Sequence, residues 1–375
     1  MKCMSTQPIV APSKTDDFMP LHGIDHVELW VGNAKQAAYF YTRAFGFREV
    51  AYAGLETGVR DRTSHVLKQG RIRLVITGAL TPDHEIAEHH GRHGDGARVI
   101  ALSVPDAAYA YRAAVERGAI GVREPWEETD DQGTVTMATI EAYGDTLHTF
   151  VERGDYSGPF LPGYQQRDDA TPGAGLLAID HIVGNVELGH MHPWVKFYED
   201  VFGMTEMLHF SDEAISTEYS ALMSKVVTDG NGRVKFPINE PAEGKRKSQI
   251  DEFLEFYGGP GAQHLAVATR DIVKTVELLR GRGVEFLTTP PSYYDDVPER
   301  IGEIEEDLED LRKLGILVDR DDEGYLLQIF TKPVGDRPTM FFEVIERHGA
   351  RGFGEGNFKA LFEAIEREQA LRGNL

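Results

Sequence analysis

Three polar side chains in the second half of the chain stand inside apolar stretches, and together they could bind a metal ion. His181 lies in Ala-Ile-Asp-His-Ile-Val, His264 in Gly-Ala-Gln-His-Leu-Ala-Val, and Glu343 in Met-Phe-Phe-Glu-Val-Ile. A carboxylate buried among apolar residues must be neutralised or meet a cation, because an isolated charge is costly to desolvate. Two neutral imidazoles and one carboxylate suit a divalent metal, and with open coordination positions they form the facial triad of iron(II) oxygenases.

Each of the three residues also has a simpler explanation. A histidine in a strand is most often a hydrogen-bonded core residue, and a glutamate in an apolar strand often faces solvent or pairs with an arginine. The pattern of the three residues alone therefore leaves both interpretations open.

The elements that must position these residues belong to an internal repeat. Ile-Asp-His occurs at residues 24–26 and again at residues 179–181. Each copy lies in a strand-like stretch, and a segment with helical periodicity follows it. Both helical segments end at a Phe-Gly pair, in which Gly46 and Gly203 suit a left-handed C-cap.

Matched helix caps extend the repeat. Asp106 and Asp271 each follow a Gly-Ala pair by the same distance, and both are predicted N-caps. Gly118 and Gly283 come later at matched spacing as predicted helix ends. Each half therefore consists of a strand, a helix and further strands, followed by the same unit again. One such unit cannot bury both faces of its sheet, so paired units are expected to curl a sheet around a shared cavity.

Composition excludes some classes of partner. The net charge is −22 and the sequence pI is near 5.0, whereas nucleic acids and anionic membranes attract basic surfaces. Cys3 is the only cysteine, which excludes an internal disulfide and a zinc–thiolate site. No apolar run is long enough for a signal peptide or a membrane span, so we expect a cytoplasmic protein with neither a nucleic-acid nor a membrane partner.

Longer motifs add a family resemblance. They are Pro-Ile-Asn-Glu-Pro at 237–241, Gly-Ala-Gln-His-Leu-Ala at 261–266, Leu-Leu-Gln-Ile-Phe-Thr-Lys-Pro at 326–333, Phe-Phe-Glu at 341–343 and Gly-Phe-Gly-Glu-Gly-Asn-Phe at 352–358. The chain resembles the vicinal-oxygen-chelate superfamily, whose paired βαβββ modules form open half-barrels. From about residue 20 onwards it resembles the 4-hydroxyphenylpyruvate dioxygenase family in particular. The expected fold class is therefore α+β, with two vicinal-oxygen-chelate domains.

The resemblance implies a cofactor, a substrate and a set of site residues. Fe(II) would be bound by His181, His264 and Glu343, and 4-hydroxyphenylpyruvate and O2 would be the small-molecule partners. Oxidative decarboxylation, ring hydroxylation and side-chain migration would yield homogentisate and CO2, as in tyrosine catabolism. The implied substrate-binding residues are Ser224, Asn239, Gln249, Gln263, Gln328, Phe330, Phe353 and Phe358, with Gln249 and Phe330 also contributing to catalysis. Gln263 would face the same side as His264 only if a bulge interrupts the strand.

The repeat and the resemblance together give an expected division of the chain. It comprises a flexible leader at 1–20, an N-terminal structural domain without metal at 21–155, a linker at 156–174, a catalytic iron domain at 175–351 and a tail helix at 352–375 that could act as a lid. Within the tail, Asn357 is expected to cap the helix. We further expect a homodimer that forms through the first domain.

The first half of the repeat carries only part of the triad. His26 matches His181, but Val99 stands where the second half has His264. The position of Glu343 is matched by Thr149 or His148, depending on one gap, and neither is a carboxylate. One metal ion per chain is therefore expected.

Three other functions remain open. Hydroxymandelate synthase uses the same substrate and metal, but it tends to carry a smaller aliphatic residue where this chain has Phe330, and it lacks the Pro-Ile-Asn motif. Extradiol catechol dioxygenases share the modules and triad, but they usually add a histidine or tyrosine for acid–base chemistry. A non-enzymatic ligand-sequestering protein of this fold would not need a complete triad.

Overall fold

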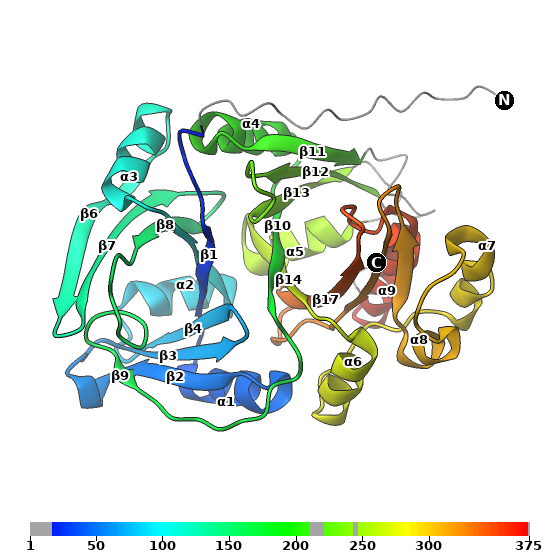
Figure 1. Ribbon diagram of the computed structural model, residues 1–375, viewed down its shortest axis with the longest axis horizontal. Coiled ribbons are helices and arrows are strands. Elements are labelled where there is room, and N and C mark those ends of the chain that lie inside the picture. Colours follow the sequence, from blue (N-terminus) through cyan, green and yellow to red (C-terminus); the bar gives the residue numbers. More distant parts are fainter. Residues whose placement is uncertain (1–16, 211–220, 243–246, 374–375) are drawn as a thin grey trace.

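Two curled mixed β-sheets, one in each half of the chain, organise the structure (Figure 1). The computed structural model describes residues 17–210, 221–242 and 247–373, so most of the expected leader lies outside the described residues. The first sheet contains β1 (Gly23–Trp30), β2 (Arg48–Ala53), β3 (Arg62–Gln69), β4 (Ile72–Ala79), β5 (Gly96–Ser103), β6 (Gly121–Asp130), β7 (Gly133–Glu141), β8 (Leu147–Glu152) and β9 (Gln165–Gln166). The second contains β10 (Ala178–Asn185), β11 (Thr205–Phe210), β12 (Ala221–Thr228), β13 (Lys235–Ala242), β14 (Gly261–Ala268), β15 (Leu317–Arg320), β16 (Tyr325–Phe330) and β17 (Phe341–His348).

The two sheets have the same topology, which confirms the predicted repeat. The first has the order β6-β7-β8-β5-β1-β4-β3-β2 with β9 at its edge, and the second has β15-β16-β17-β14-β10-β13-β12-β11. In each, an antiparallel central pair, β1–β5 or β10–β14, joins the two modules. Parallel pairs flank that centre in the same way, β1–β4 and β5–β8 in the first sheet and β10–β13 and β14–β17 in the second.

Helices pack around the two sheets. They are α1 (Ala34–Phe45), α2 (Glu85–His93), α3 (Ala107–Glu116), α4 (Met191–Phe202), α5 (Gln249–Tyr257), α6 (Ile272–Gly281), α7 (Val297–Ile301), α8 (Leu308–Leu314) and α9 (Phe358–Leu371). Short 3₁₀ turns occupy Leu55–Thr57, Pro291–Tyr294 and Glu355–Asn357. Within the part of the chain that is described, no helix is both long and apolar enough to cross a bilayer.

The matched caps behave as the sequence predicts. The side chains of Asp106 and Asp271 accept hydrogen bonds from the backbone N–H groups at the starts of α3 and α6. Gly46 and Gly203 end α1 and α4 in the left-handed conformation, with φ of 76° and 66°. Asn357 occupies the N-cap position of α9 as predicted, but its side chain makes no cap hydrogen bond and instead accepts one from the Tyr293 hydroxyl.

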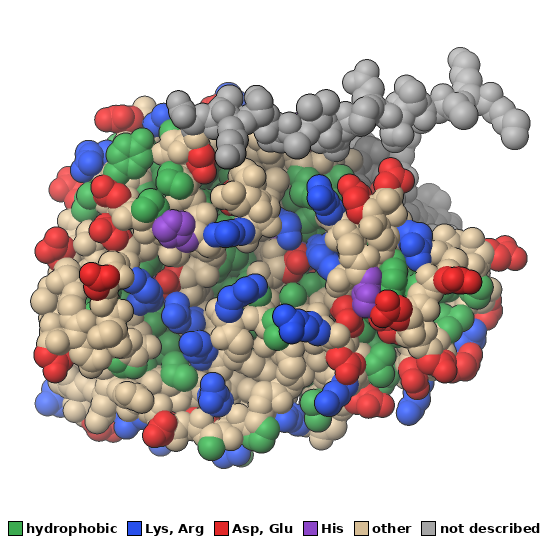
Figure 2. All heavy atoms as spheres, in the orientation of Figure 1, with side chains coloured by type: hydrophobic (Ala, Val, Ile, Leu, Met, Phe, Trp, Pro, Cys, Tyr) green, Lys and Arg blue, Asp and Glu red, His purple; other side chains and the backbone are tan. Residues whose placement is uncertain are grey.

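One continuous apolar core joins the two halves. Phe342 of β17 is fully buried, and its ring lies 4.9 Å from Phe45 and 5.8 Å from Tyr41, both on α1. At a second contact, His148 Nε2 of β8 lies 2.8 Å from the Tyr198 hydroxyl of α4. The surface differs from this core: Figure 2 shows acidic and basic side chains interspersed over one face, with acidic ones gathered over α7 and α8.

The segment expected to be a linker also packs on the first sheet. Its Phe160 is buried, and its β9 pairs with β2. Where the chain enters the second half, Gln69 holds it in place. Gln69 Oε1 lies within hydrogen-bond distance of three successive N–H groups, at 2.6 Å from Ala174, 3.1 Å from Gly175 and 3.3 Å from Leu176, and its Nε2 donates to the Phe45 carbonyl.

Replacing Gln69 with alanine should destabilise the protein substantially. The change leaves buried backbone donors and a carbonyl without partners, and an unsatisfied buried group costs about 1–3 kcal/mol. We expect a loss of that size in the free energy of unfolding, measured by urea denaturation. Gln166→Ala is the matched control, since its side chain is exposed and the change should have almost no effect. Equal losses in the two variants would contradict this role for Gln69.

Candidate metal centre and its cavity

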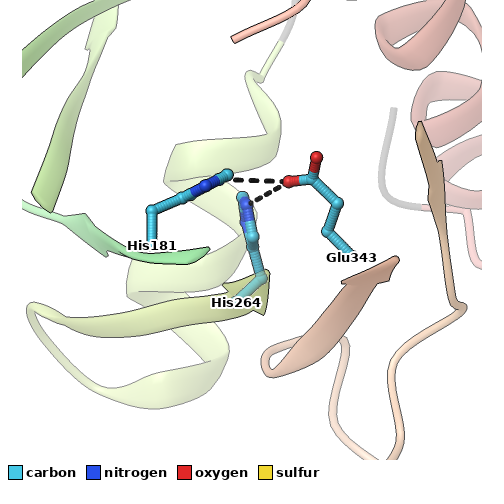
Figure 3. Close-up of side chains that lie close together, drawn as sticks. All are labelled: His181, His264 and Glu343. Atoms are coloured by element: carbon cyan, nitrogen blue, oxygen red, sulfur yellow. Dashed lines mark ion pairs between the residues drawn. The ribbon is translucent and has the colours of Figure 1, made fainter. Parts of the chain in front are cut away.

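Three neighbouring strands at the centre of the second sheet bring His181, His264 and Glu343 together. His181 on β10 lies opposite Ala266 of β14, and Ala266 in turn lies beside Glu343 of β17. His264 is two residues from Ala266 along β14, so its side chain points to the same face of the sheet. Figure 3 shows the three side chains converging from these strands.

The donor atoms are as close as ligands of one ion would be. Glu343 Oε2 lies 3.2 Å from His181 Nε2 and 3.3 Å from His264 Nε2. The three donor atoms all lie within 4.8 Å of one another. The side chains are nearly inaccessible, with exposed fractions of 3% for His181, 9% for His264 and 4% for Glu343. Two imidazoles and a carboxylate in this arrangement fit a divalent metal ion.

The charge balance of the site calls for a cation. Burial alone would raise the pKa of Glu343, but the imidazole of His181, together with His264, outweighs burial and lowers that pKa to about 2. Burial likewise opposes protonation of His181, but the adjacent Glu343 raises the His181 pKa overall. For His264, burial prevails and lowers the pKa. A divalent cation would supply the positive charge that the ionised Glu343 otherwise draws from His181.

Each imidazole is oriented by a hydrogen bond at its other nitrogen. His181 Nδ1 donates to Asp180 Oδ1 at 2.8 Å, and His264 Nδ1 donates to Gln263 Oε1 at 3.0 Å. With Nδ1 engaged in this way, a neutral imidazole would offer Nε2, the nitrogen nearer Glu343, to a metal ion, as metal-binding histidines require. Burial would raise the pKa of Asp180, but hydrogen bonds from His181 and Arg347 hold it well below its usual range.

His181, His264 and Glu343 lie in a cavity between the sheet and the tail. On β10, β12, β13 and β17 strand alternation selects its wall, because residues two apart line it together. The lining residues are His181, Val183, Leu222, Ser224, Val226, Pro237, Asn239, Gln249, Gln263, His264, Phe330, Phe341, Glu343, Phe353, Phe358, Leu361 and Phe362.

A β-bulge brings Gln263 to the cavity. Along the β10–β14 ladder, Val183 pairs with His264 but Gly184 pairs with Ala262, so Gln263 is an extra residue in β14. The bulge turns Gln263 to the face that His264 uses, and both residues line the cavity. The bulge that Gln263 needs in order to face the same side as His264 is therefore present in the structure.

Gln328 is the one predicted site residue that does not line this cavity. It is 1% exposed, and its Oε1 has no hydrogen-bond partner within the described structure. It lies beneath Gly354, where a Cβ atom would fall 2.5 Å from the Gln328 amide. Gly354 also has a φ of 80°, so both space and backbone conformation favour glycine there.

Sequence reasoning missed several residues of the apolar wall. Phe341 stacks on His264, with ring centroids 4.8 Å apart and an interplanar angle of 22°. Phe341 precedes Glu343 by two residues in the same strand, so alternation could have placed it on the site face. Leu361 and Phe362 of α9 also line the cavity, and their helical spacing with Phe358 was the signal available.

The first half has no equivalent metal centre among its described residues. The ladder places Val99 where the second half has His264, and Thr149 beside Ala101 as Glu343 is beside Ala266. This register selects Thr149 over His148 as the counterpart of Glu343. The described residues hold one further His–carboxylate group, Glu306, Glu346 and His348.

That further group is a hydrogen-bonded ion-pair cluster near the surface. Glu306 Oε2 accepts from the Tyr325 hydroxyl, and Glu346 Oε2 accepts from the Ile272 N–H. The His348 side chain is 24% exposed, in contrast to the deeply buried triad.

Comparisons with known proteins agree with this geometry. The model of the Glyoxalase/Bleomycin resistance protein/Dioxygenase superfamily matches residues 23–143 and 178–329. The 4-hydroxyphenylpyruvate dioxygenases of Dictyostelium discoideum and Danio rerio are each 50% identical to this chain, covering 95% and 96% of it and 100% and 92% of their own lengths. A solved mutant of 4-hydroxymandelate synthase from Streptomyces coelicolor is 37% identical, with a TM-score of 0.86, over 94% of this chain and 100% of that one. The chain therefore belongs to the 4-hydroxyphenylpyruvate dioxygenase family, within the glyoxalase and dioxygenase superfamily.

Proposed function

We propose that this protein is a 4-hydroxyphenylpyruvate dioxygenase that uses Fe(II) bound by His181, His264 and Glu343. It converts 4-hydroxyphenylpyruvate and O2 into homogentisate and CO2, and both oxygen atoms of O2 enter the organic product. The observation that carries the proposal is the convergence of two oriented imidazoles and one ionised carboxylate on a largely apolar cavity. Relatives with this activity in their names, 45–50% identical over nearly the whole chain, supply the substrate.

The cavity leaves room for the substrate and O2 beside the proposed metal position. His181, His264 and Glu343 would hold Fe(II) from the side of the sheet, and the cavity lies on the other side. Bound Fe(II) would supply the redox chemistry by which O2 reacts with the keto acid and the ring. The chain holds its three ligands on adjacent strands, so their relative positions depend on the sheet hydrogen bonds and little on loops.

The cavity wall is suited to an aromatic keto acid. Phe353 and Phe358 would flank the aromatic ring, while the apolar residues of α9 exclude water from the reacting centre. Polar groups lie on the remaining sides: Ser224 and Asn239 pair across β12 and β13, and Gln249 begins α5. These groups and Gln263 would bind the polar ends of the substrate, with Gln328 supporting the wall from behind Gly354.

The other functions receive less support. For the described residues, the cavity lining contains no tyrosine and no third histidine, although extradiol catechol dioxygenases usually have one for acid–base chemistry. A ligand-sequestering protein would not need the oriented triad. Hydroxymandelate synthase remains the nearest rival, and Phe330 and Pro-Ile-Asn at 237–239 favour homogentisate as the product.

The rest of the chain would support this site. The first half would act as a metal-free structural domain and provide the contact of a homodimer, which sedimentation of the purified protein tests. The tail would act as a lid. Its helix α9 is attached at its far end by two ion pairs, Arg372 with Glu252 at 2.7 Å and Lys332 with Glu368 at 3.1 Å.

Removing any one ligand should abolish the metal centre. His181→Ala, His264→Ala and Glu343→Gln should each eliminate tight iron binding and turnover, as measured by iron content and homogentisate formation. His26→Ala is the matched control, because His26 occupies the same place in the first half and should leave one iron per chain and near-wild-type turnover. Wild-type turnover in Glu343→Gln, or two tightly bound ions per wild-type chain, would show that the site is misassigned.

Phe330 should control which carbon is oxidised. It pairs with Glu343 across β16 and β17, and its ring lies 6.0 Å from His264, so it limits how the substrate ring can turn beside the metal. Phe330→Ile should divert part of the product from homogentisate to hydroxymandelate, as chromatography would detect. A slower reaction that still gives homogentisate alone would argue against this role.

The tail should protect the reaction from water. Deleting residues 352–375 removes three aromatic residues of the wall and should uncouple O2 uptake from homogentisate formation, measured together with an oxygen electrode and chromatography. Substituting the exposed Leu371 at the end of α9 with serine is the control and should leave coupling intact. A truncated enzyme that folds and remains fully coupled would refute the lid.

A further inference from the structure

One arginine contacts both the carboxylate that orients His181 and the start of the tail. Arg347, near the end of β17, donates from Nε to Asp180 Oδ2 and from Nη2 to Asp180 Oδ1, each at 2.9 Å. Its third group, Nη1, donates to the carbonyls of Gly352 at 2.6 Å and Ala350 at 3.2 Å. Its guanidinium carbon lies 5.5 Å from the centroid of the Phe353 ring.

The two features that Arg347 contacts meet inside the cavity. Phe353 lies edge-on to His181, with ring centroids 4.8 Å apart. The His181 ring is oriented by its hydrogen bond to Asp180. Phe353 follows Gly352, whose carbonyl accepts a hydrogen bond from Arg347. A movement of Arg347 would therefore disturb both the ligand and the wall.

We infer that Arg347 is a positioning residue that fixes the His181 imidazole and the Phe353 side chain relative to each other. The inference rests on the proposed function for the identity of the metal ligand and the substrate wall. Arg347 contacts neither metal nor substrate, so it acts through Asp180 and through the tail backbone.

The shape of the guanidinium explains why arginine is needed. Its planar fork binds both oxygens of Asp180 and so fixes the plane of that carboxylate, while the remaining nitrogen reaches the tail carbonyls. Lys235 also approaches Asp180, at 3.5 Å, but an ammonium acts as a point charge and does not set the orientation of the carboxylate plane. A lysine at position 347 would preserve the charge, but it could not bind both Asp180 oxygens and the Gly352 carbonyl at the same time in this geometry.

The first half contains the same network without a metal centre. Asp25 contacts His26 Nδ1 at 2.7 Å, and Arg153 donates to both Asp25 oxygens at 2.7 Å. Arg153 also donates to the Phe160 carbonyl, and the Phe160 ring lies 5.0 Å from His26, edge-on. Because Val99 and Thr149 stand at the other ligand positions, this copy can influence folding but not metal binding.

Arg153 therefore provides a matched control: replacing it tests what the loss of the same arginine network does to folding, without affecting the metal site. In metal-stripped protein, Arg347→Lys should weaken Co²⁺ binding about 10- to 100-fold, as expected when the partner of a ligand is lost, and should change the Co²⁺ absorption spectrum. Arg153→Lys should leave the Co²⁺ affinity and spectrum as in the wild type. The denaturation midpoints of Arg347→Lys and Arg153→Lys should fall by similar amounts. In the iron enzyme, Arg347→Lys should also lower kcat and the ratio of homogentisate formed to O2 consumed, whereas Arg153→Lys should not.

Further variants and outcomes make the test decisive. Asp180→Asn keeps the shape of the side chain but weakens its hydrogen bonds to Arg347 and His181, so it should reproduce the Co²⁺ effects of Arg347→Lys. It replaces Arg347→Lys in the test if that variant does not fold. Wild-type Co²⁺ affinity and spectrum in Arg347→Lys, or equal weakening by Arg153→Lys, would overturn the inference, as would a wild-type chain that binds no Co²⁺. If wild type binds Co²⁺ and His181→Ala does not, yet no 4-hydroxyphenylpyruvate is converted, the proposed function fails while the Co²⁺ comparison still decides the role of Arg347.

Discussion

The arrangement of the second half depends on one buried charge, the carboxylate of Glu343. An ionised group in the middle of an apolar strand is tolerated only where opposite charge or strong donors surround it. Here the surroundings are two imidazoles, one on the adjacent strand β14 and one on the next strand, β10, each held by a hydrogen bond at its far nitrogen. The sheet register, the orienting side chains and the aromatic cover all maintain this arrangement around a position suited to a cation.

Local patterns allowed much of the fold to be predicted. Ile-Asp-His, the Phe-Gly ends and the Asp caps are short signals whose structural meaning depends on neighbouring residues, and the two sheets confirm the duplication they indicate. The pattern of polar residues inside apolar strands singled out His181, His264 and Glu343, but it left a metal site and ordinary core residues both open until the family resemblance was added. The family resemblance then predicted a set of substrate-binding residues, of which all but Gln328 line the cavity.

Features that depend on distant pairing were not predictable in the same way. Whether Gln263 faces the site depends on a bulge, and the bulge is visible only in the register of β14 against β10. Asp180 and Arg347 are 167 positions apart, so nothing local connects them. Asn357 has the residue type of a helix cap, yet a tertiary partner, Tyr293, takes its side chain. In each case a long-range contact determines a choice that local chemistry leaves open.

The alternation of β17 makes the two halves of the chain depend on each other. Glu343 faces the cavity, while its neighbour Phe342 faces the other way and packs against α1 of the first half. The first half thus packs against the back of the strand that carries the carboxylate. It has Val99 and Thr149 at two of the three matched positions, yet its removal would expose Phe342 to water. The two halves are therefore one packed unit rather than two independent modules.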